Sequence, residues 1–384
     1  MSKPSFLIAK PHIHALTSLR FFAALCIVIL HAIDHDLLDI PWYQILDLSK
    51  AVSFFFVLSG FVLAYAYIKR DYVLSDFYQS RFARIWPATV ASVFFVLMIL
   101  PRATFLPDVN SDWALGSVFF LNLIGIQSWV PIPAVFFGLN AVTWSISVEA
   151  SFYGFFPFFS KMKLKLLLYS LGIVCVYGLF AAYCVDSLSI QSFSPQTLNV
   201  PVWEGFLYIN PIARLPEFIF GILAGRAFVS ELYQQKISEM HSISDKYPII
   251  SSAIELLIFL CLVYLGLKGT SFQGSIPYLT ILNQWFSGLW FACLICVAAS
   301  SRGILGQFLN WTPLVFLGEI SFGLYLYHQP LMIKAAQTTG LPLGGFQLLP
   351  DSFLPVLVWS LVVSAISFYC LEKPLQLLLR PSRV

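Results

Sequence analysis

The most conspicuous shortage in this sequence is charge. Only 11% of its 384 residues are Asp, Glu, Lys or Arg, whereas 59% are hydrophobic and the mean hydropathy is +0.81. Soluble globular domains carry about 25% charged residues. The chain therefore has too little charge to cover a water-exposed surface. This shortage excludes a soluble globular protein and predicts a chain embedded in a membrane.

Other shortages exclude further classes of protein. A formal net charge of only +3 provides no basic stripe, so we expect no nucleic-acid partner. The seven cysteines lie mostly in or beside apolar runs, which indicates packing residues and not a disulfide framework. Cys293 and Cys296 form a CxxC in an apolar run without a second ligand pair, and we interpret them in the same way. The longest non-apolar stretches, 185–207 and 230–248, are too short for a core of their own. We expect a single transmembrane domain, 1–384, with no separate soluble domain.

Repeated apolar runs of near 20 residues are abundant, and that length crosses a hydrocarbon core of about 30 Å. They predict an all-α fold, a polytopic integral membrane helix bundle with about ten transmembrane helices. The first run is too long and too aromatic for a signal peptide, so we expect it to be a retained first helix. The expected helices lie near 15–33, 50–68, 85–101, 143–160, 164–184, 208–228, 250–267, 283–300, 313–333 and 353–371.

Charge placement predicts the topology, because positive residues concentrate in cytoplasmic loops. Lys and Arg cluster before the first run, after the second, after 143–160 and near the C-terminus. All clusters fall on one side of the membrane only with ten spans and both termini cytoplasmic. The further apolar run 113–126 would be only about 21 Å long as a helix. It suits a re-entrant or interfacial segment, and counting it as a span would put the KMKLK cluster on the wrong side.

Charged residues inside a bilayer cost about 2.5–3.5 kcal/mol each, so each one needs a reason. Arg20 and His31 lie eleven positions apart on the first expected helix, which places both on one stripe about 16 Å apart. This spacing suits a ligand with an anionic head at Arg20 and a reactive end at His31; a snorkelling anchor and a packing histidine are the alternative. Asp34 follows His31 at a helical offset of three and could stabilise its imidazolium. A metal site with His35 is the weaker interpretation, and we expect no metal.

Arg81 and Arg84 lie at an offset of three, on one helical face just before an expected membrane span. Two guanidinium groups so placed can bind phosphates bidentately. Positive-inside anchoring is the alternative.

Several other polar side chains interrupt apolar runs. Glu149 should face the bundle interior or a cavity, where it could orient a base, bind a hydroxyl or neutralise an arginine. Arg214 and Glu217 lie at an offset of three and could pair with each other; Arg214 is also a candidate for substrate binding. Tyr325 and His328 share a helical face and could line a polar substrate cavity or belong to an interfacial belt.

Six segments, in order along nearly the whole chain, resemble the membrane acyltransferase family 3, which includes bacterial O-acetyltransferases of surface polysaccharides. They are SLRFFAALCIVILHA, SFFFVLSGFVLAY, SRFARIWPA, TWSISVEASFY, EISFGLYLYHQP and LEKPL. The resemblance places the family's first-helix arginine and histidine on Arg20 and His31, its RxxR motif on Arg81 and Arg84, and its glutamate on Glu149.

Two departures from the family pattern occur. Ser53 stands where an acidic residue usually precedes FFxLSGF, and Ala150 and Ser151 follow Glu149 in place of Glu and Gln. These departures bear on local substrate contacts more than on the class of reaction.

The resemblance implies a multi-pass acyltransferase of the inner (cytoplasmic) membrane that uses acyl-CoA, most simply acetyl-CoA, as a co-substrate without a permanently bound cofactor. Arg20, Arg81 and Arg84 would bind its phosphates. His31 would be the general base towards a hydroxyl of a carbohydrate or glycolipid acceptor, helped by Asp34 or Glu149. The family's additional hydrolase-like domain is not seen in the sequence, which suggests action alone or with a separate envelope-polysaccharide assembly partner. A polytopic transporter or permease for a small solute is the alternative, although no inverted repeat is visible.

Overall fold

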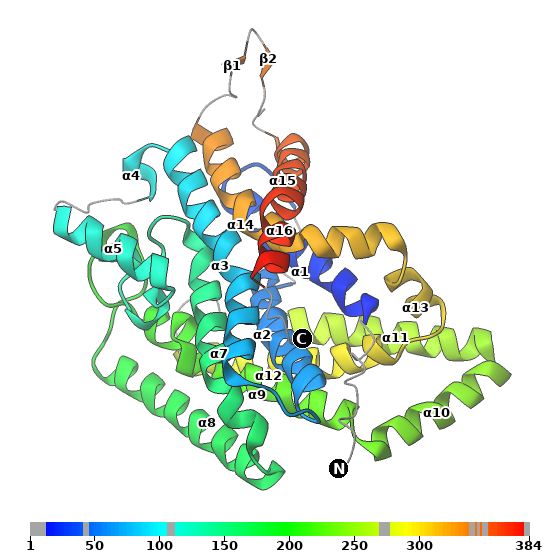
Figure 1. The fold of residues 1–384 in the computed structure, drawn as a ribbon. Helices are drawn as coiled ribbons and strands as arrows, with labels where there is room; N and C mark the ends of the chain where they lie inside the picture. Colours follow the sequence, from blue (N-terminus) through cyan, green and yellow to red (C-terminus); the bar gives the residue numbers. More distant parts are fainter. Residues whose placement is uncertain are drawn as a thin grey trace.

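The computed structural model describes residues 13–40, 46–105, 112–268, 277–337, 342–343, 346–347 and 352–379. These residues form a bundle of helices (Figure 1). They also include two short antiparallel strands of two residues each, β1 (Pro342–Leu343) and β2 (Phe346–Gln347). The expectation of a polytopic helical bundle is confirmed.

Eight helical segments of the described chain are long and apolar enough to cross a membrane. Three of these segments combine an α-helix with another helical turn. A 3-10 turn that begins at Leu48 leads into α2 (Ala51–Tyr67), and a π-helical turn at Gly205–Ile209 precedes α9 (Pro211–Phe228). The third segment runs from α15 (Phe353–Ser367) through a π-helical turn into α16 (Lys373–Leu378). The other five are α1 (His14–Asp34), α3 (Leu74–Ile99), α8 (Leu164–Ser187), α11 (Pro248–Leu267) and α12 (Pro277–Ser300).

Two further helices of comparable length lie within the bundle, α7 (Trp144–Lys161) and α14 (Thr312–Gln337). Both bury polar side chains, and neither belongs to the eight segments that are long and apolar enough to cross a membrane. The expected count of ten spans includes both of them. That count, and the cytoplasmic side of the termini, stay predictions.

Shorter helices connect the long ones. The run expected at 113–126 forms α5 (Asp112–Ile124), whose 13 residues span about 20 Å, less than a hydrocarbon core of about 30 Å. The remaining short elements are α4 (Arg102–Phe105), α6 (Pro133–Phe136), α10 (Glu231–Lys246), α13 (Ile304–Leu309) and 3-10 turns at Gln127–Trp129, Ala141–Thr143 and Pro195–Thr197.

The structure corrects one expected boundary and adds one helix. α3 begins at Leu74, not near residue 85, because the polar stretch before the apolar run continues the same helix and carries Asp76 in its first turn. The stretch 230–248, identified in the sequence only as non-apolar, contains α10, whose Ser230 side chain caps the helix by accepting the Tyr233 N–H. Hydropathy alone misses both, since each segment is helical without being apolar.

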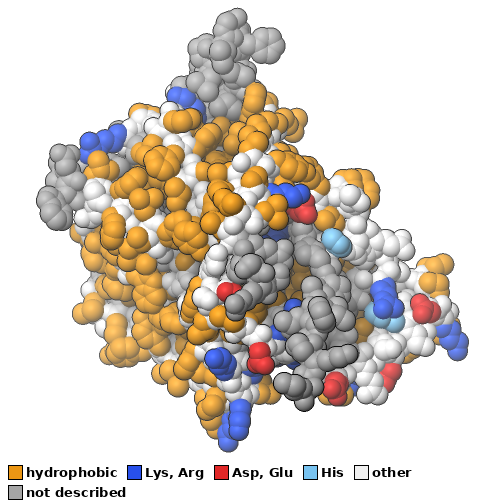
Figure 2. Space-filling view, viewed as in Figure 1, with side chains coloured by type: hydrophobic (Ala, Val, Ile, Leu, Met, Phe, Trp, Pro, Cys, Tyr) orange, Lys and Arg blue, Asp and Glu red, His pale blue; other side chains and the backbone are white. Residues whose placement is uncertain are grey.

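Lipid-facing and interior helices differ in what they bury. Only 11% of the apolar window of α11 and 17% of that of α8 are buried inside the protein, against 78% for the segment containing α2. Outward-facing apolar side chains of this kind match a hydrocarbon surrounding. Figure 2 shows a broad hydrophobic surface, with charged side chains gathered towards the lower edge and over α10.

Close helix crossings hold the interior together. A Cβ on Gly221 of α9 would collide with the Val57 carbonyl oxygen of α2, and one on Gly318 of α14 with the Thr17 carbonyl oxygen of α1. Small residues let helix backbones approach in this way within membranes. α1 and α14 meet again at His31 and His328, so these two helices run in the same direction, side by side.

Candidate active site

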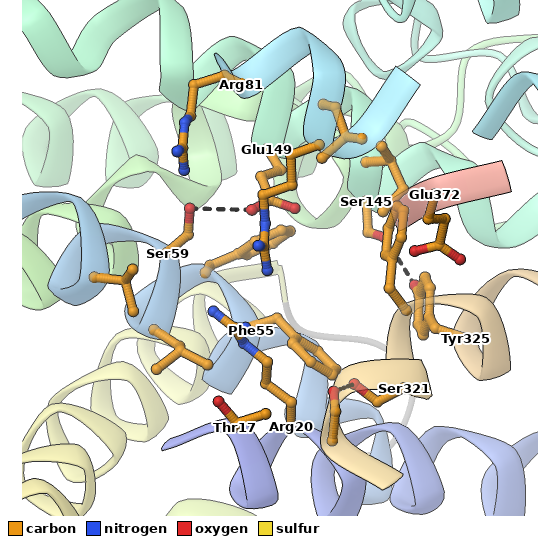
Figure 3. A pocket seen from close by; sticks show the side chains of 18 of the residues that line it. Thr17, Arg20, Phe55, Ser59, Arg81, Ser145, Glu149, Ser321, Tyr325 and Glu372 are labelled. Carbon is orange, nitrogen blue, oxygen red and sulfur yellow. Dashed lines mark hydrogen bonds between the residues drawn. The ribbon is translucent and has the colours of Figure 1, made fainter. Parts of the chain in front are cut away.

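A cavity of ≈ 410 Å³ lies among α1, α2, α3, α7, α14 and the C-terminal helices (Figure 3). Its polar and charged lining comes from segments that are far apart in the sequence. These lining residues are Thr17, Arg20, Ser59, Arg81, Arg84, Ser145, Glu149, Tyr153, Glu319, Ser321, Tyr325, Glu372 and Gln376. Five of the residues singled out in the sequence therefore meet at one place: Arg20, Arg81, Arg84, Glu149 and Tyr325.

Three arginines supply the positive charge of this cavity. Arg20 and Arg81 reach into it from opposite walls, on α1 and α3 (Figure 3). Arg84 lies one turn after Arg81 on the same helix, as the RxxR spacing predicts. The Arg81 guanidinium carbon is 6.0 Å from the ring centre of Tyr67 and 5.8 Å from that of Tyr153, which holds the side chain between two aromatic faces.

Glu149 is fixed by two hydroxyl donors. The Tyr153 hydroxyl donates to its Oε1 at 2.5 Å, and the Ser59 hydroxyl donates to the same oxygen at 3.2 Å. Glu319 and the buried Glu372 also line the cavity, so carboxylates and guanidinium groups share its wall. No sequence pattern had singled out Ser59, Tyr153 or Glu372. The offset of four between Glu149 and Tyr153 was the one local signal that could have identified a partner.

Tyr325 lines the cavity and also contacts one of the histidines. Its hydroxyl shares a 2.8 Å hydrogen bond with Ser145 and donates to the Val142 carbonyl at 3.3 Å. Its ring centre lies 6.0 Å from that of Phe55, and also 6.0 Å from that of His328. One turn of α14 therefore connects the cavity wall to His328.

His31 and His328 form a direct pair beyond Tyr325. The Nδ1 of His31 lies 2.8 Å from the Nε2 of His328, and the two ring planes differ by only 10°. His328 is fully buried, and its Nδ1 is 3.0 Å from the Leu324 carbonyl oxygen. His31 itself is not among the described residues that line the cavity. A chain of contacts, Tyr325 to His328 to His31, joins the two parts of the site.

The turn of α14 before Pro330 is stabilised from outside the helix. Pro330 has no N–H and leaves the Leu326 carbonyl without its helical donor. The buried Asn140 amide donates to that carbonyl at 2.9 Å and to the Ser92 hydroxyl at 3.0 Å. Asn140 thus holds the turn of α14 that carries Tyr325 and His328.

Asp34 takes a different place from the one its sequence offset suggests. It is the last residue of α1 and is exposed, and no hydrogen bond or ion pair joins it to His31 within the described residues. A carboxylate that orients His31 would hydrogen-bond to one of its ring nitrogens. The Nδ1 of His31 is instead hydrogen-bonded to His328. A catalytic role for Asp34 stays a prediction.

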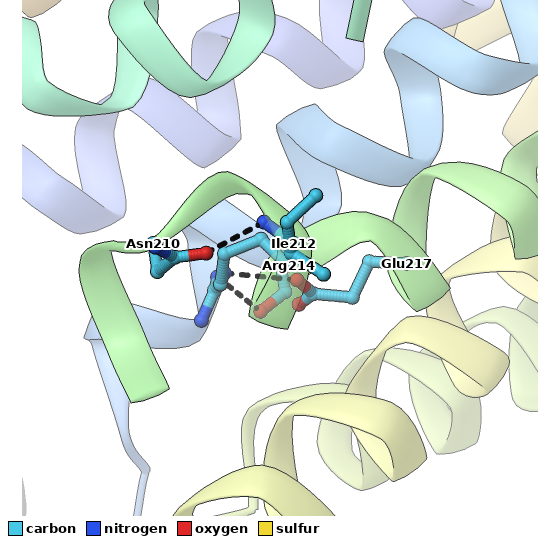
Figure 4. Close-up of polar contacts among 5 residues, drawn as sticks. Asn210, Ile212, Arg214 and Glu217 are labelled. Carbon is cyan, nitrogen blue, oxygen red and sulfur yellow. Dashed lines mark hydrogen bonds and ion pairs between the residues drawn. The ribbon is translucent and has the colours of Figure 1, made fainter. Parts of the chain in front are cut away.

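Arg214 lies outside the cavity, in a separate buried cluster (Figure 4). Its Nε is 2.9 Å from Glu217, which confirms the local pairing, and its Nη2 donates to Ser53 at 3.1 Å. The guanidinium also lies 5.0 Å from the ring centre of Phe56 and 4.8 Å from that of Tyr208. Ser53, one of the departures from the family pattern, is therefore an acceptor for this arginine.

Comparison with known proteins agrees with the motifs and their placement. The family described as "Acyltransferase domain" (acyltransferase 3) matches residues 13–369. The chain belongs to acyltransferase family 3. It is 34% identical to "Acyltransferase MdmB" of Streptomyces mycarofaciens over 222 residues, which cover 54% of this chain and 56% of that protein.

Two longer matches involve relatives named as O-acetyltransferases. The chain is 24% identical to "Putative peptidoglycan O-acetyltransferase YrhL" of Bacillus subtilis, over 95% of its own length and 55% of the relative's. It is 23% identical to "O-acetyltransferase OatA" of Staphylococcus aureus, over 84% of its length and 51% of the relative's. The chain spans about half the length of the curated relatives it matches. No solved structure matches it.

Proposed function

We propose that this protein is a membrane O-acyltransferase that moves an acyl group, most simply acetyl, from cytoplasmic acyl-CoA to a hydroxyl of a cell-envelope or exported carbohydrate. The observation that carries the proposal is the cavity in which Arg20, Arg81 and Arg84 converge, one turn of α14 away from the His31–His328 pair. Membership of acyltransferase family 3 and relatives named O-acetyltransferase support the reaction class.

The donor would enter along the arginines. A coenzyme A phosphate is a multivalent anion, and guanidinium groups bind phosphates through paired, charge-assisted hydrogen bonds. The cavity volume of ≈ 410 Å³ falls within the range of about 300–1,000 Å³ that small-molecule sites occupy. That volume suits the pantetheine arm, with the nucleotide part remaining at the opening. Glu149 would then serve as a counter-charge to the arginines, since it lines the same cavity.

The chemical step would take place at His31. A ring nitrogen of His31 would accept the proton of the acceptor hydroxyl as the hydroxyl oxygen attacks the thioester carbonyl, and the carbon–sulfur bond would break. The proton then passes to the departing thiolate, which yields an ester and free coenzyme A. To reach His31, the thioester would have to pass Tyr325, which lines the cavity and whose ring centre lies 6.0 Å from that of His328.

The proposal also covers the glycan that accepts the acyl group and the membrane in which the protein works. The name of one relative points to an envelope glycan, peptidoglycan, and lipopolysaccharide or exopolysaccharide offers the same hydroxyl chemistry. Such an enzyme would work in the inner membrane as a multi-pass protein, alone or with an envelope-polysaccharide assembly partner.

Mass spectrometry of envelope and exported glycans tests this function in cells with the intact gene, without the gene, with His31→Ala, and with His241→Ala as a matched histidine control on α10. We expect acylated glycan only with the intact gene and His241→Ala. Identical glycan profiles in all strains, together with a changed uptake or efflux of a solute, would replace the transferase with a transporter.

A further inference from the structure

The hydrogen bonds around His328 fix which ring nitrogen of His31 is free. A backbone carbonyl oxygen can only accept, so the His328 Nδ1 that lies 3.0 Å from the Leu324 oxygen must carry a hydrogen. In a neutral imidazole the other nitrogen is then bare and can only accept. The 2.8 Å contact between His328 Nε2 and His31 Nδ1 therefore requires His31 Nδ1 to be the donor.

This assignment leaves the Nε2 of His31 without a hydrogen. We propose that His328 is the positioning residue of the transferase: it holds His31 in the tautomer whose Nε2 can accept a proton, and aims the ring. The inference rests on the proposed function, since it names the group that prepares the base of that reaction. It assigns to His328 a role different from contact with the substrate.

The surroundings of His328 suit this role. The side chain is fully buried and lies on α14 beside Tyr325, and its Nδ1 is fixed by a carbonyl of its own helix. The near-coplanar rings point nitrogen to nitrogen, so rotation of either ring breaks the bond. When His31 takes up a proton, its Nδ1–H strengthens the bond to His328, much as a carboxylate supports the histidine of a catalytic triad. His328 neither gains nor loses a proton in this step.

Two amide substitutions separate positioning from simple space filling. The amide end of Gln reaches the place of the histidine Nε2, so His328→Gln can still accept from His31. The shorter Asn places its amide near the Nδ1, so His328→Asn can still serve the Leu324 carbonyl but not reach His31. His328→Leu removes both bonds, and Tyr327→Phe on the same helix, which loses only its 3.2 Å bond to Ser367, is the control.

The test measures kcat, KM for acetyl-CoA and donor binding for each purified variant, with His31→Ala in parallel. We expect His328→Asn and His328→Leu to lose kcat by about 10²- to 10⁴-fold with KM and donor affinity unchanged. His328→Gln should stay within about tenfold of the wild type, and Tyr327→Phe should match it. Wild-type kcat in His328→Leu beside an inactive His31→Ala would overturn the positioning role alone. An active His31→Ala would instead overturn the proposed role of His31.

A second measurement does not depend on activity or on the stability of a variant. Solid-state ¹⁵N NMR of the wild-type protein in lipid, with its six histidines labelled, reports which ring nitrogens carry hydrogen. We expect a protonated Nδ1 and a bare Nε2 on His31, with a through-bond correlation to His328. A hydrogen on the His31 Nε2 would overturn the proposal.

Discussion

His31 and His328 are 297 positions apart, and their ring nitrogens are 2.8 Å apart. The two parallel helices that carry them, α1 and α14, also touch at Thr17 and Gly318. The first contact lies at the histidines and the second at the arginine-lined cavity, whose wall includes both Thr17 and Gly318. One helix pair thus sets the distance between the arginine-lined cavity and the proposed base.

Replacing Gly318 with alanine should damage both stability and activity. The added Cβ would collide with the Thr17 carbonyl oxygen and push α1 away from α14. Overpacking of this kind costs about 1–3 kcal/mol, so we expect a lower Tm for the protein in detergent, together with a lower kcat. Gly172→Ala is the control, because Gly172 is exposed on α8 with nothing within 4 Å of the new Cβ. Equal Tm and kcat in both variants would show that the close crossing is not needed.

Replacing Arg84 with glutamine should weaken donor binding. A charge-assisted hydrogen bond contributes about 1.5–3 kcal/mol, which predicts a KM for acetyl-CoA raised by about 10- to 100-fold. We expect kcat at saturating donor to change little, because Arg84 is proposed to bind phosphate and not the reacting carbonyl. The control is Lys163→Gln, an exposed positive residue outside the cavity.

A donor that lacks the ribose phosphate of coenzyme A refines this test. If Arg81 or Arg84 contacts that phosphate, replacing the arginine weakens binding of acetyl-CoA but has no further effect on binding of the dephosphorylated donor. Unchanged affinity for both donors in both arginine variants would remove the phosphate-binding role.

The Arg214–Glu217 pair should behave as a structural unit. Glu217→Leu leaves Arg214 buried without its 2.9 Å partner, and breaking a buried pair costs about 3–5 kcal/mol. The double variant Arg214→Met/Glu217→Leu should recover most of the lost Tm, since replacing both partners is close to neutral. We also expect it to recover transfer activity. A stable double variant that no longer acylates the acceptor would favour the substrate-binding role predicted from the sequence.

Asn140 and Pro330 should be energetically coupled. Asn140→Leu leaves the Leu326 carbonyl without a donor, which costs about 1–3 kcal/mol of stability. Pro330→Ala restores a backbone N–H that can donate to this carbonyl within the helix. We therefore expect the Asn140→Leu/Pro330→Ala protein to have a higher Tm than Asn140→Leu alone. Additive losses in the double variant would contradict the role given to Asn140 as the donor to this carbonyl.

Local spacing predicted those pairs of side chains that lie within one helix. The Arg81–Arg84 face and the Arg214–Glu217 pair are confirmed, because an offset of three fixes neighbours on a helix whatever surrounds it. The same rule favoured Asp34 as the partner of His31. The helix ends at Asp34, however, and a long-range contact to α14 takes the nitrogen in question.

Long-range pairing could not be predicted from the sequence. Nothing near His31 indicates that residue 328 will meet it, because that meeting depends on which helix packs against α1. The sequence likewise does not indicate that the Ser59 hydroxyl on α2 donates a hydrogen bond to Glu149 on α7. Hydropathy identified the helices because each apolar run must cross lipid, and it missed the beginning of α3 because that turn is polar.

The most direct test of the central claim follows the acyl group itself. Purified protein in lipid vesicles receives acetyl-labelled acetyl-CoA and envelope carbohydrate extracted from cells that lack the gene, with His31→Ala in a parallel sample. The account predicts alkali-labile label on the carbohydrate, with an equal amount of free coenzyme A released, in the wild type only. Intact acetyl-CoA and unlabelled carbohydrate in the wild-type sample, or equal transfer by His31→Ala, would contradict it.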